Sequence, residues 1–209
     1  ALALYGFDDD WTGPLADMAA SVLRTPLESP WGTGPLCALA PGDRLHELEF
    51  TLPLAPVTPD GLADAFARAG EPVADFAGVI ARLGFQQVRG FLRGFIDMVF
   101  VRDGRYYLLD WKSNHLGDSP SEYSAERMAS EMLRHHYILQ YHLYAVALHR
   151  YLARRIRDYD YARHFGGVYY LFVRGMDPAD NARPGVFFDL PSAALIESLG
   201  RYFDGEDRP

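Results

Sequence analysis

Two aspartates and a lysine stand on either side of a predicted hairpin turn near the middle of the chain. Asp97 precedes the dipeptide Asp103-Gly104, and Asp110 and Lys112 follow it. Asp-Gly favours a two-residue mirror-image turn because both of its central residues adopt positive φ. Such a turn pairs Asp97 with Asp110 across the two strands, with Cβ atoms about 5 Å apart. Lys112, two residues further on, is expected on the same face.

Facing carboxylates in an apolar setting need compensation, because they repel each other and lose hydration. A shared proton, a cationic partner such as Lys112 or a divalent metal could supply it. Hard oxygen ligands with open positions suit Mg²⁺, which can activate water and neutralise a phosphodiester. The plainer alternative is a buried Asp–Lys ion pair, with the second aspartate bonded to the backbone. We favour the metal, because two acids and one base leave a charge uncompensated.

The composition draws attention to Lys112. The chain has 20 Lys and Arg residues, of which 19 are Arg, so Lys112 is its single lysine. An ammonium is a compact charge with an adjustable pKa, which suits contact with an attacking water better than a guanidinium does. The net charge of −8 would normally argue against a nucleic-acid partner. The acidity is concentrated in residues 1–80, with 12 acidic and 3 basic side chains against 16 and 17 in the remainder.

The elements that must position these residues are strands and a long helix. Strand-like runs cover 87–92, 94–102 and 105–113. A helical pattern over 122–157 follows, broken near His135-His136. Strands at 165–174 and 186–190 and a helix at 192–203 complete the pattern. Strands, then a long helix, then more strands indicate an α/β fold with a mixed central β-sheet flanked by helices.

The N-terminal third is less regular. We expect a helix at 8–24, a loop at 25–43, a strand at 46–52 ended by Pro53, and helices from 58 and near 73–83. Within the hairpin, alternation places Phe95 and Val99 on the face of Asp97, and Ile96 and Met98 on the other. Both faces are largely apolar, which is typical of a covered central hairpin.

Several classes of protein are excluded or disfavoured. The lone Cys37 excludes an internal disulfide and four-cysteine zinc or iron–sulfur sites, and fits a reducing, cytoplasmic setting. No run approaches the roughly 18 apolar residues of a membrane-spanning helix, so we expect no membrane partner. There is no P-loop, so we expect no ATP site in this chain, and there is no G-x-S-x-G motif of the kind that holds a catalytic serine.

Longer motifs around the hairpin resemble a nuclease family. Gly94-Phe95-Ile96-Asp97, followed by the run from Tyr107 to Asn114, resembles the D…(D/E)-x-K core of PD-(D/E)XK nucleases. With Val88-Arg89-Gly90 upstream, the helix segment around Gln140 and the run from His164 to Phe172, the chain is similar to the C-terminal nuclease domains of the RecB family. The resemblance extends from about residue 6 to about residue 200.

The resemblance implies a role for each matching residue. Asp97 and Asp110 would be metal ligands, with the backbone carbonyl of Trp111 as a third oxygen donor. Lys112 would be the catalytic lysine. Glu47 matches an acidic residue that supports the metal or its waters. The implied ion is Mg²⁺, with Mn²⁺ or Ca²⁺ as substitutes.

Gln140 and Tyr144 match the Q-x-x-x-Y motif of RecB-like nucleases. Their spacing puts both on one helical face, where they would contact the same phosphate or strand. Tyr144 could alternatively be a core aromatic of an amphipathic helix. That alternative is poorer for Gln140, because a polar amide in an aromatic stripe needs a hydrogen-bond partner.

The family also implies a function and partners. The expected function is Mg²⁺-dependent DNA phosphodiester hydrolysis within an ATP-dependent helicase–nuclease, exodeoxyribonuclease V, in double-strand break repair by homologous recombination. The helicase would deliver single strands, and the RecC and RecD subunits would be partners. The alternative is a non-catalytic module that docks the recombinase RecA or the partner subunits. A stand-alone restriction-type endonuclease is disfavoured by the Q-x-x-x-Y helix and by the missing upstream ligand.

One feature of the family pattern is missing. The family uses a metal-ligating histidine in a G-x-x-x-H setting well upstream, and no residue before residue 8 supplies it. We therefore expect residues 1–209 to be a single nuclease domain, a fragment of a longer helicase–nuclease chain without that helix. Such a fragment should bind metal more weakly and be weakly active or inactive alone. We interpret His46 as a structural or surface residue.

Two further groups favour plainer interpretations. His142 and His149 on the long helix are expected to be packing or surface histidines, because no cysteine or close acid accompanies them. The basic end of that helix carries Arg150, Arg154, Arg155 and Arg157. It is interpreted as a solvated terminus that complements the helix dipole, although a partner surface stays open.

Overall fold

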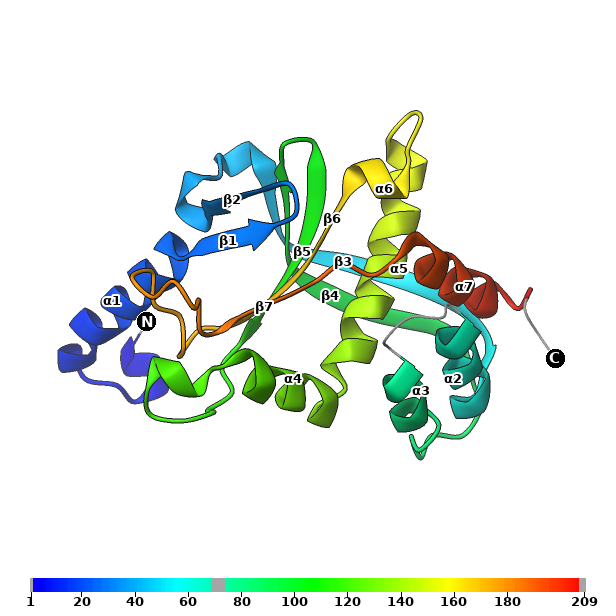
Figure 1. The fold of residues 1–209 in the computed structure, drawn as a ribbon, viewed down its shortest axis with the longest axis horizontal. Coiled ribbons are helices and arrows are strands. Elements are labelled where there is room, and N and C mark those ends of the chain that lie inside the picture. Colours follow the sequence, from blue (N-terminus) through cyan, green and yellow to red (C-terminus); the bar gives the residue numbers. More distant parts are fainter. Residues whose placement is uncertain (1, 69–73, 207–209) are drawn as a thin grey trace.

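The centre of the molecule is a five-stranded mixed sheet (Figure 1). The computed structural model describes residues 2–68 and 74–206. The strand order is β3-β4-β5-β6-β7, and only the β5–β6 pair is parallel. The strands are β3 Arg44–Val57, β4 Val88–Arg102, β5 Arg105–Lys112, β6 Phe165–Phe172 and β7 Val186–Asp189. Helices flank this sheet, so the predicted fold class is confirmed, and it is compatible with a PD-(D/E)XK nuclease-like fold.

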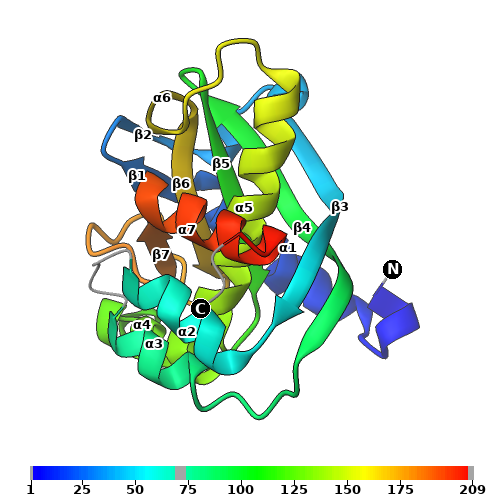
Figure 2. The ribbon, with the colours of Figure 1, turned by 90° about the vertical axis from the view of Figure 1, so that its right-hand side faces the viewer.

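The helices gather mainly on one side of the sheet, with α5 crossing it and α2, α3 and α7 beyond (Figures 1 and 2). They are α1 Thr12–Arg24, α2 Pro59–Arg68, α3 Ala74–Ile80, α4 Ala125–Arg134, α5 Tyr137–Arg155, α6 Tyr161–His164 and α7 Ala193–Asp204. Short 3₁₀ turns occupy Leu2–Tyr5, Asp9–Trp11, Leu36–Ala38, Pro41–Asp43 and Pro120–Glu122. No helix among the described residues has the length and apolar character needed to cross a membrane.

The predicted break in the long helix is confirmed. α4 ends at Arg134 and α5 begins at Tyr137, with His136 between them in the left-handed conformation at φ 55°. The break lets α4 and α5 run in different directions. Of the helix expected near 73–83, residue 73 lies outside the described residues, and α3 forms the part from Ala74 to Ile80.

The sheet separates two apolar cores. The larger core lies under α5, and its sheet residues include Ile96, Val99, Leu108 and Tyr170. The smaller core lies on the opposite face. It is formed by residues of β4, β5 and β6 together with the N-terminal segment, namely Val22, Leu27, Leu36, Met98, Phe100, Tyr107, Leu109, Tyr169, Leu171 and Met176.

The loop expected at 25–43 is wrong in part, because it contains a hairpin. β1 Pro26–Ser29 pairs with β2 Gly32–Pro35. The hairpin is held from outside: Leu27 is fully buried, and the Arg102 guanidinium donates to the carbonyls of Leu27 and Pro35. These long-range contacts override the local turn signals of the glycines and prolines.

The predicted end of this strand at Pro53 is also wrong, because β3 continues through Pro53 to Val57. β3 is the edge strand of the sheet and pairs with β4 alone. A proline lacks a backbone N–H, which an edge strand tolerates because one of its sides has no neighbouring strand.

The alternation of faces slips by one residue in the middle of β3 and β4. Leu45 and Leu48 line the same side of the sheet with Val99, and Ile96 joins Val99 in the larger core. The predicted alternation is therefore wrong here: Ile96 is fully buried and Phe95 is 51% exposed.

The slip occurs at Glu47 in β3 and Asp97 in β4. Glu47 has φ 53°, the left-handed conformation that interrupts an extended strand. The flanking pairs are His46–Met98 and Leu48–Ile96, with the Glu47–Asp97 position between them. The irregularity therefore changes which side chains of the two strands face the larger core, at the position of Asp97.

Candidate functional site

The predicted site lies where β4 and β5 separate. Their pairing ends at Met98–Leu109, whereas β5 continues beside β6 to Lys112. The Oδ2 atom of Asp97 accepts a hydrogen bond of 2.9 Å from the backbone N–H of Trp111. The expected cross-strand pair of Asp97 and Asp110 is thus replaced by a fork, in which the Asp97 carboxylate bridges the two strands.

The same fork orients the backbone carbonyl of Trp111. In an extended strand, the N–H and C=O groups of one residue point to the same side. Because the Trp111 N–H points to Asp97, its carbonyl oxygen lies on that side too, beyond the last β4–β5 pair. The end of the β4–β5 pairing therefore brings together two groups that could bind a metal, the Trp111 carbonyl oxygen and the Asp97 carboxylate.

Asp110 and Lys112 form a buried ion pair on β5. Asp110 is 4% exposed and Lys112 is 8% exposed, and the Nζ–Oδ1 distance is 2.5 Å. Burial raises the pKa of Asp110, the Lys112 ammonium opposes that shift, and the nearby Asp97 adds to it. Asp97 and Asp110 therefore interact electrostatically, and a single ammonium balances only one of the two carboxylates.

Lys112 is surrounded by groups from three elements. Its ammonium donates to Oε1 of Gln140 on α5 at 3.1 Å. It also lies 3.8 Å from the ring centre of Tyr137 and 4.7 Å from that of Tyr170, which are cation–π distances. Asp110 and Gln140 occupy two of its three N–H donors, so one remains for a water or a phosphate oxygen.

Gln140 connects the lysine to two tyrosines. Its Oε1 also accepts from the Tyr170 hydroxyl at 2.9 Å, and its Nε2 donates to the Tyr144 hydroxyl at 2.8 Å. The amide therefore has a partner on each side. The structure brings Gln140 and Tyr144 together with Lys112, and the expectation that a polar amide needs partners is met.

Tyr144 is held by apolar contacts below its hydroxyl. Its ring packs edge-on against Phe50 at 5.5 Å between centres. Phe50 in turn lies across Gly94, where an added Cβ would stand 2.7 Å from the Phe50 ring. Burial, followed by the charge of Asp110, raises the pKa of Tyr144 to about 12. The hydroxyl therefore stays protonated at neutral pH, accepting from Gln140 while able to donate its own hydrogen.

Glu47 is placed differently from the other predicted ligands. It is exposed and lies at the strand slip, and no three His, Cys, Asp or Glu side chains among the described residues come close enough to hold a metal ion. Glu47 therefore does not complete a three-carboxylate group with Asp97 and Asp110.

The donors that remain fit a hard cation. Two carboxylates with one ammonium leave a negative charge, and the Trp111 carbonyl adds a neutral oxygen on the side of Asp97. Mg²⁺ binds in this way, through one or two carboxylates while it keeps several waters. Asp97, Asp110 and the Trp111 carbonyl are the groups that would hold it.

The sequence did not single out Tyr137 and Tyr170, which enclose the lysine. Burial, followed by the charge of Asp110, raises the pKa of Tyr170 well above its usual value. Tyr137 lies three residues before Gln140, a spacing that puts both on one helical face. Tyr170 had no such signal, because only the parallel pairing of Asp110 with Tyr170 brings β6 to the site.

The histidines of α5 lie away from this site. His142 is fully buried, its ring stands edge-on to Phe66, and its Nδ1 bonds to the carbonyl of Ile138 at 2.7 Å. His149 contacts the hydroxyl of Tyr159. Both have the packing role that was expected of them.

Comparison with known proteins adds a family relationship. No protein-family model matches the chain. The chain is 44% identical over 205 residues to the RecBCD enzyme subunit RecB of Escherichia coli, covering 98% of this chain and 17% of that protein. The corresponding values are 39% over 196 residues for RecB of Haemophilus influenzae, covering 94% and 16%. For RecB of Mycobacterium tuberculosis they are 43% over 182 residues, covering 78% and 17%.

The matches extend over most of this chain and only a small part of each relative. The chain spans about one sixth of the length of these curated relatives. Both the motif resemblance and the identities point to one subunit type. The chain is therefore homologous to a segment of RecB, the subunit of the RecBCD enzyme.

Proposed function

We propose that this chain hydrolyses phosphodiester bonds of DNA in a Mg²⁺-dependent reaction, as the nuclease part of a helicase–nuclease. The observation that carries the proposal is the fork between β4 and β5. It gathers two carboxylates, a backbone carbonyl and a buried ammonium beside a glutamine and tyrosine pair. Uncompensated negative charge next to a hydrogen-bond donor is the arrangement that a cation and a phosphate would complete.

The residues of the chain have separate tasks in this proposal. Asp97, Asp110 and the Trp111 carbonyl would hold Mg²⁺, with Mn²⁺ or Ca²⁺ able to replace it. The ion would supply charge neutralisation for the phosphodiester and a lower pKa for a water near it. The free N–H of Lys112 would hold the attacking water or a phosphate oxygen. Attack on phosphorus breaks the bond to the leaving oxygen, which takes up a proton.

Gln140 and Tyr144 would position the strand. Gln140 fixes the direction of the Lys112 ammonium by accepting from it at 3.1 Å. Tyr144, held by Gln140 and by the Phe50 ring, would donate its hydroxyl hydrogen to a phosphate oxygen. Neither task requires a change of charge, because the raised pKa of Tyr144, about 12, keeps its hydroxyl protonated.

The relatives are named as subunits of the RecBCD enzyme. By homology, this chain would act with RecC and RecD subunits on single strands delivered by a helicase, in double-strand break repair by homologous recombination. Docking of the recombinase RecA is the alternative role. Variants that lose DNA cleavage but keep RecA binding would distinguish the two roles.

The decisive experiment compares two aspartates of the same hairpin. Asp110→Asn should abolish Mg²⁺-dependent cleavage of single-stranded DNA in a RecBCD assembly that contains this chain, and should leave helicase activity unchanged. Asp103→Asn is the matched control, because asparagine suits the left-handed turn position of Asp103 at φ 52°. Cleavage retained by Asp110→Asn would overturn the proposal.

A further inference from the structure

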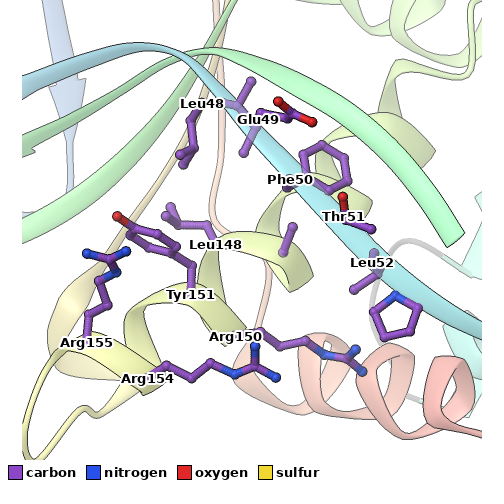
Figure 3. A pocket seen from close by; sticks show the side chains of 13 residues that line it. Leu48, Glu49, Phe50, Thr51, Leu52, Leu148, Arg150, Tyr151, Arg154 and Arg155 are labelled. Carbon is purple, nitrogen blue, oxygen red and sulfur yellow. The ribbon is translucent and has the colours of Figure 1, made fainter.

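A groove lies between β3 and the C-terminal half of α5, outside the candidate site (Figure 3). It has a volume of about 410 Å³. Its walls include the apolar side chains of Leu48 and Leu148, and Arg150, Arg154 and Arg155 line it from α5. Three of the four arginines that were interpreted as a solvated helix end are thus grouped along a defined hollow.

The groove carries unpaired positive charge. Two acidic groups near it are already paired: Glu49 with Arg93 and Asp204 with Arg150. Among the described residues, no carboxylate forms an ion pair with Arg154 or Arg155. The groove therefore has an excess of guanidinium groups in a chain whose net charge is −8.

An aromatic ring lies among these cations. The Arg155 guanidinium stands 4.7 Å from the ring centre of Tyr151, and both residues line the groove (Figure 3). Flat aromatic side chains next to arginines are the combination by which proteins bind single-stranded nucleic acids, because bases stack on the rings and phosphates pair with the cations.

The groove is continuous with the candidate site along α5. Gln140, Tyr144, Tyr151 and Arg155 follow one another at helical spacings of four, seven and four, which puts them on one face. From Gln140 to Arg155 that face is about 22 Å long at 1.5 Å per residue. Phe50, whose ring contacts Tyr144, lines both this groove and the hollow beside Gln140.

We propose that this groove binds the single DNA strand on which the candidate site acts. Phosphates would lie against Arg154 and Arg155, and a base would stack on Tyr151. The inference rests on the proposed function, because it assigns the strand a route toward Lys112. An apolar peptide would leave the two guanidinium groups without partners, whereas a polyanion with flat bases fits both the charge and the ring.

The test is the salt dependence of binding. Anisotropy of a labelled oligo(dT) is measured in EDTA, so that no cleavage occurs, over a range of salt concentrations. Each phosphate contact on a single strand contributes about 0.7 to the slope of log affinity against log salt. Arg154→Ala/Arg155→Ala should lower the affinity at least about tenfold and reduce the slope by about 1.4. Tyr151→Leu should lower the affinity about tenfold with the slope unchanged.

The matched control is Arg157→Ala/Arg163→Ala, which removes the same charge from two exposed positions that do not line the groove. It should keep the wild-type slope and affinity. Equal values for the two double variants would overturn the inference. So would competition by polyglutamate as strong as that by unlabelled oligo(dT), which would identify the groove as a site for acidic peptides.

The experiment also separates this inference from the proposed function. If the arginine-dependent slope is found but a RecBCD assembly that contains the wild-type chain cleaves no DNA with Mg²⁺, the proposed function fails and the groove assignment stands. If the protein cleaves DNA and the slope does not depend on Arg154 and Arg155, the groove assignment alone fails.

Discussion

Two buried ionisable groups lie on opposite sides of α5, Lys112 and His142, and their surroundings differ. Lys112 is 8% exposed and meets a carboxylate, an amide oxygen and two aromatic rings. His142 is fully buried and bonds only to the carbonyl of Ile138, while its Nε2 atom has no partner among the described residues.

The contrast shows that burial of an ionisable group does not by itself make a functional site. The partners of Lys112 come from β5, α5 and β6. They surround an ammonium that keeps one N–H donor free for a further ligand. The neighbours of His142 are aromatic rings, namely Phe66 and Tyr141, and its complete burial favours the uncharged imidazole. Convergence of polar groups from separate elements is what distinguishes the candidate site around Lys112.

The largest expected effect concerns the lysine. Lys112→Ala should lower the rate of DNA cleavage by about a thousandfold, within the range for the loss of a donor that stabilises charge in the transition state. Lys112→Arg should also lose activity, because a larger planar guanidinium does not reproduce the contacts of the compact ammonium with Asp110 and Gln140. Single-turnover cleavage measures the effect. His142→Leu, assayed at neutral pH, should keep wild-type activity, and a loss equal to that of Lys112→Ala would contradict the contrast.

The second effect concerns the histidine and the free energy of unfolding. Burial lowers the pKa of His142 to about 4 from a usual 6.5. Between these values the unfolded chain holds more protons, so this contribution to stability is complete above pH 6.5 and is lost as the pH falls toward 4. The loss should reach about 3 kcal/mol, at 1.36 kcal/mol for each pKa unit.

Urea unfolding of the wild type and of His142→Leu over this pH range measures that loss, because subtraction removes the contribution of other groups. The curve of the variant should fall less steeply as the pH is lowered. His136→Asn is the control, since His136 is exposed and asparagine tolerates its left-handed conformation. Parallel curves for the wild type and His142→Leu would refute the assignment.

The third effect tests the charge beside Lys112. Mg²⁺ or Ca²⁺ should raise the melting temperature of the wild type. At a hundredfold excess of metal over its dissociation constant, the free energy of unfolding should increase by about 3 kcal/mol. Asp97→Asn should abolish the metal-dependent rise, while its amide oxygen still accepts from the Trp111 N–H. Asp103→Asn should respond as the wild type does. A full metal response in Asp97→Asn would remove Asp97 from the ligand set.

The smallest effect concerns one hydroxyl. Tyr144→Phe keeps the ring on Phe50 and removes the acceptor of the Gln140 amide, so DNA cleavage should fall about fivefold, as for the loss of about 1 kcal/mol of hydrogen bonding. Tyr159→Phe, whose hydroxyl lies near His149, is the control and should cleave at the wild-type rate. The ratio of the two rates is the measurement, and a ratio of one would assign Tyr144 to packing alone.

Local patterns determined much of this protein. The Asp103-Gly104 turn sets the β4–β5 pairing from Arg102–Arg105 to Met98–Leu109 as expected, because turn geometry fixes the register of a hairpin. The spacing of Gln140 and Tyr144 places them on one face of α5. The family resemblance follows from the motifs around Asp110 and Lys112, and the RecB homologues bear it out.

Tertiary structure decided the features that depend on distant segments. The slip at Glu47 and Asp97 exposes Phe95 and buries Ile96, because the side chain that faces the larger core is decided by the helices that cover that face as well as by alternation along the strand. The β1–β2 hairpin and the passage of β3 through Pro53 depend on contacts that no local pattern shows.

The candidate site likewise has some features that follow from the sequence and others that depend on tertiary structure. The sequence alone singled out Asp97, Asp110, Lys112, Gln140 and Tyr144 as candidates, because the residues of each motif are close in the chain. Only the fold brought Tyr170 to the lysine through the parallel β5–β6 pairing, buried His142 beside Phe66, and opened a groove along the arginines of α5. Each of these is a long-range contact, and long-range contacts are set by the packing of whole elements, which residue types and spacings do not encode locally.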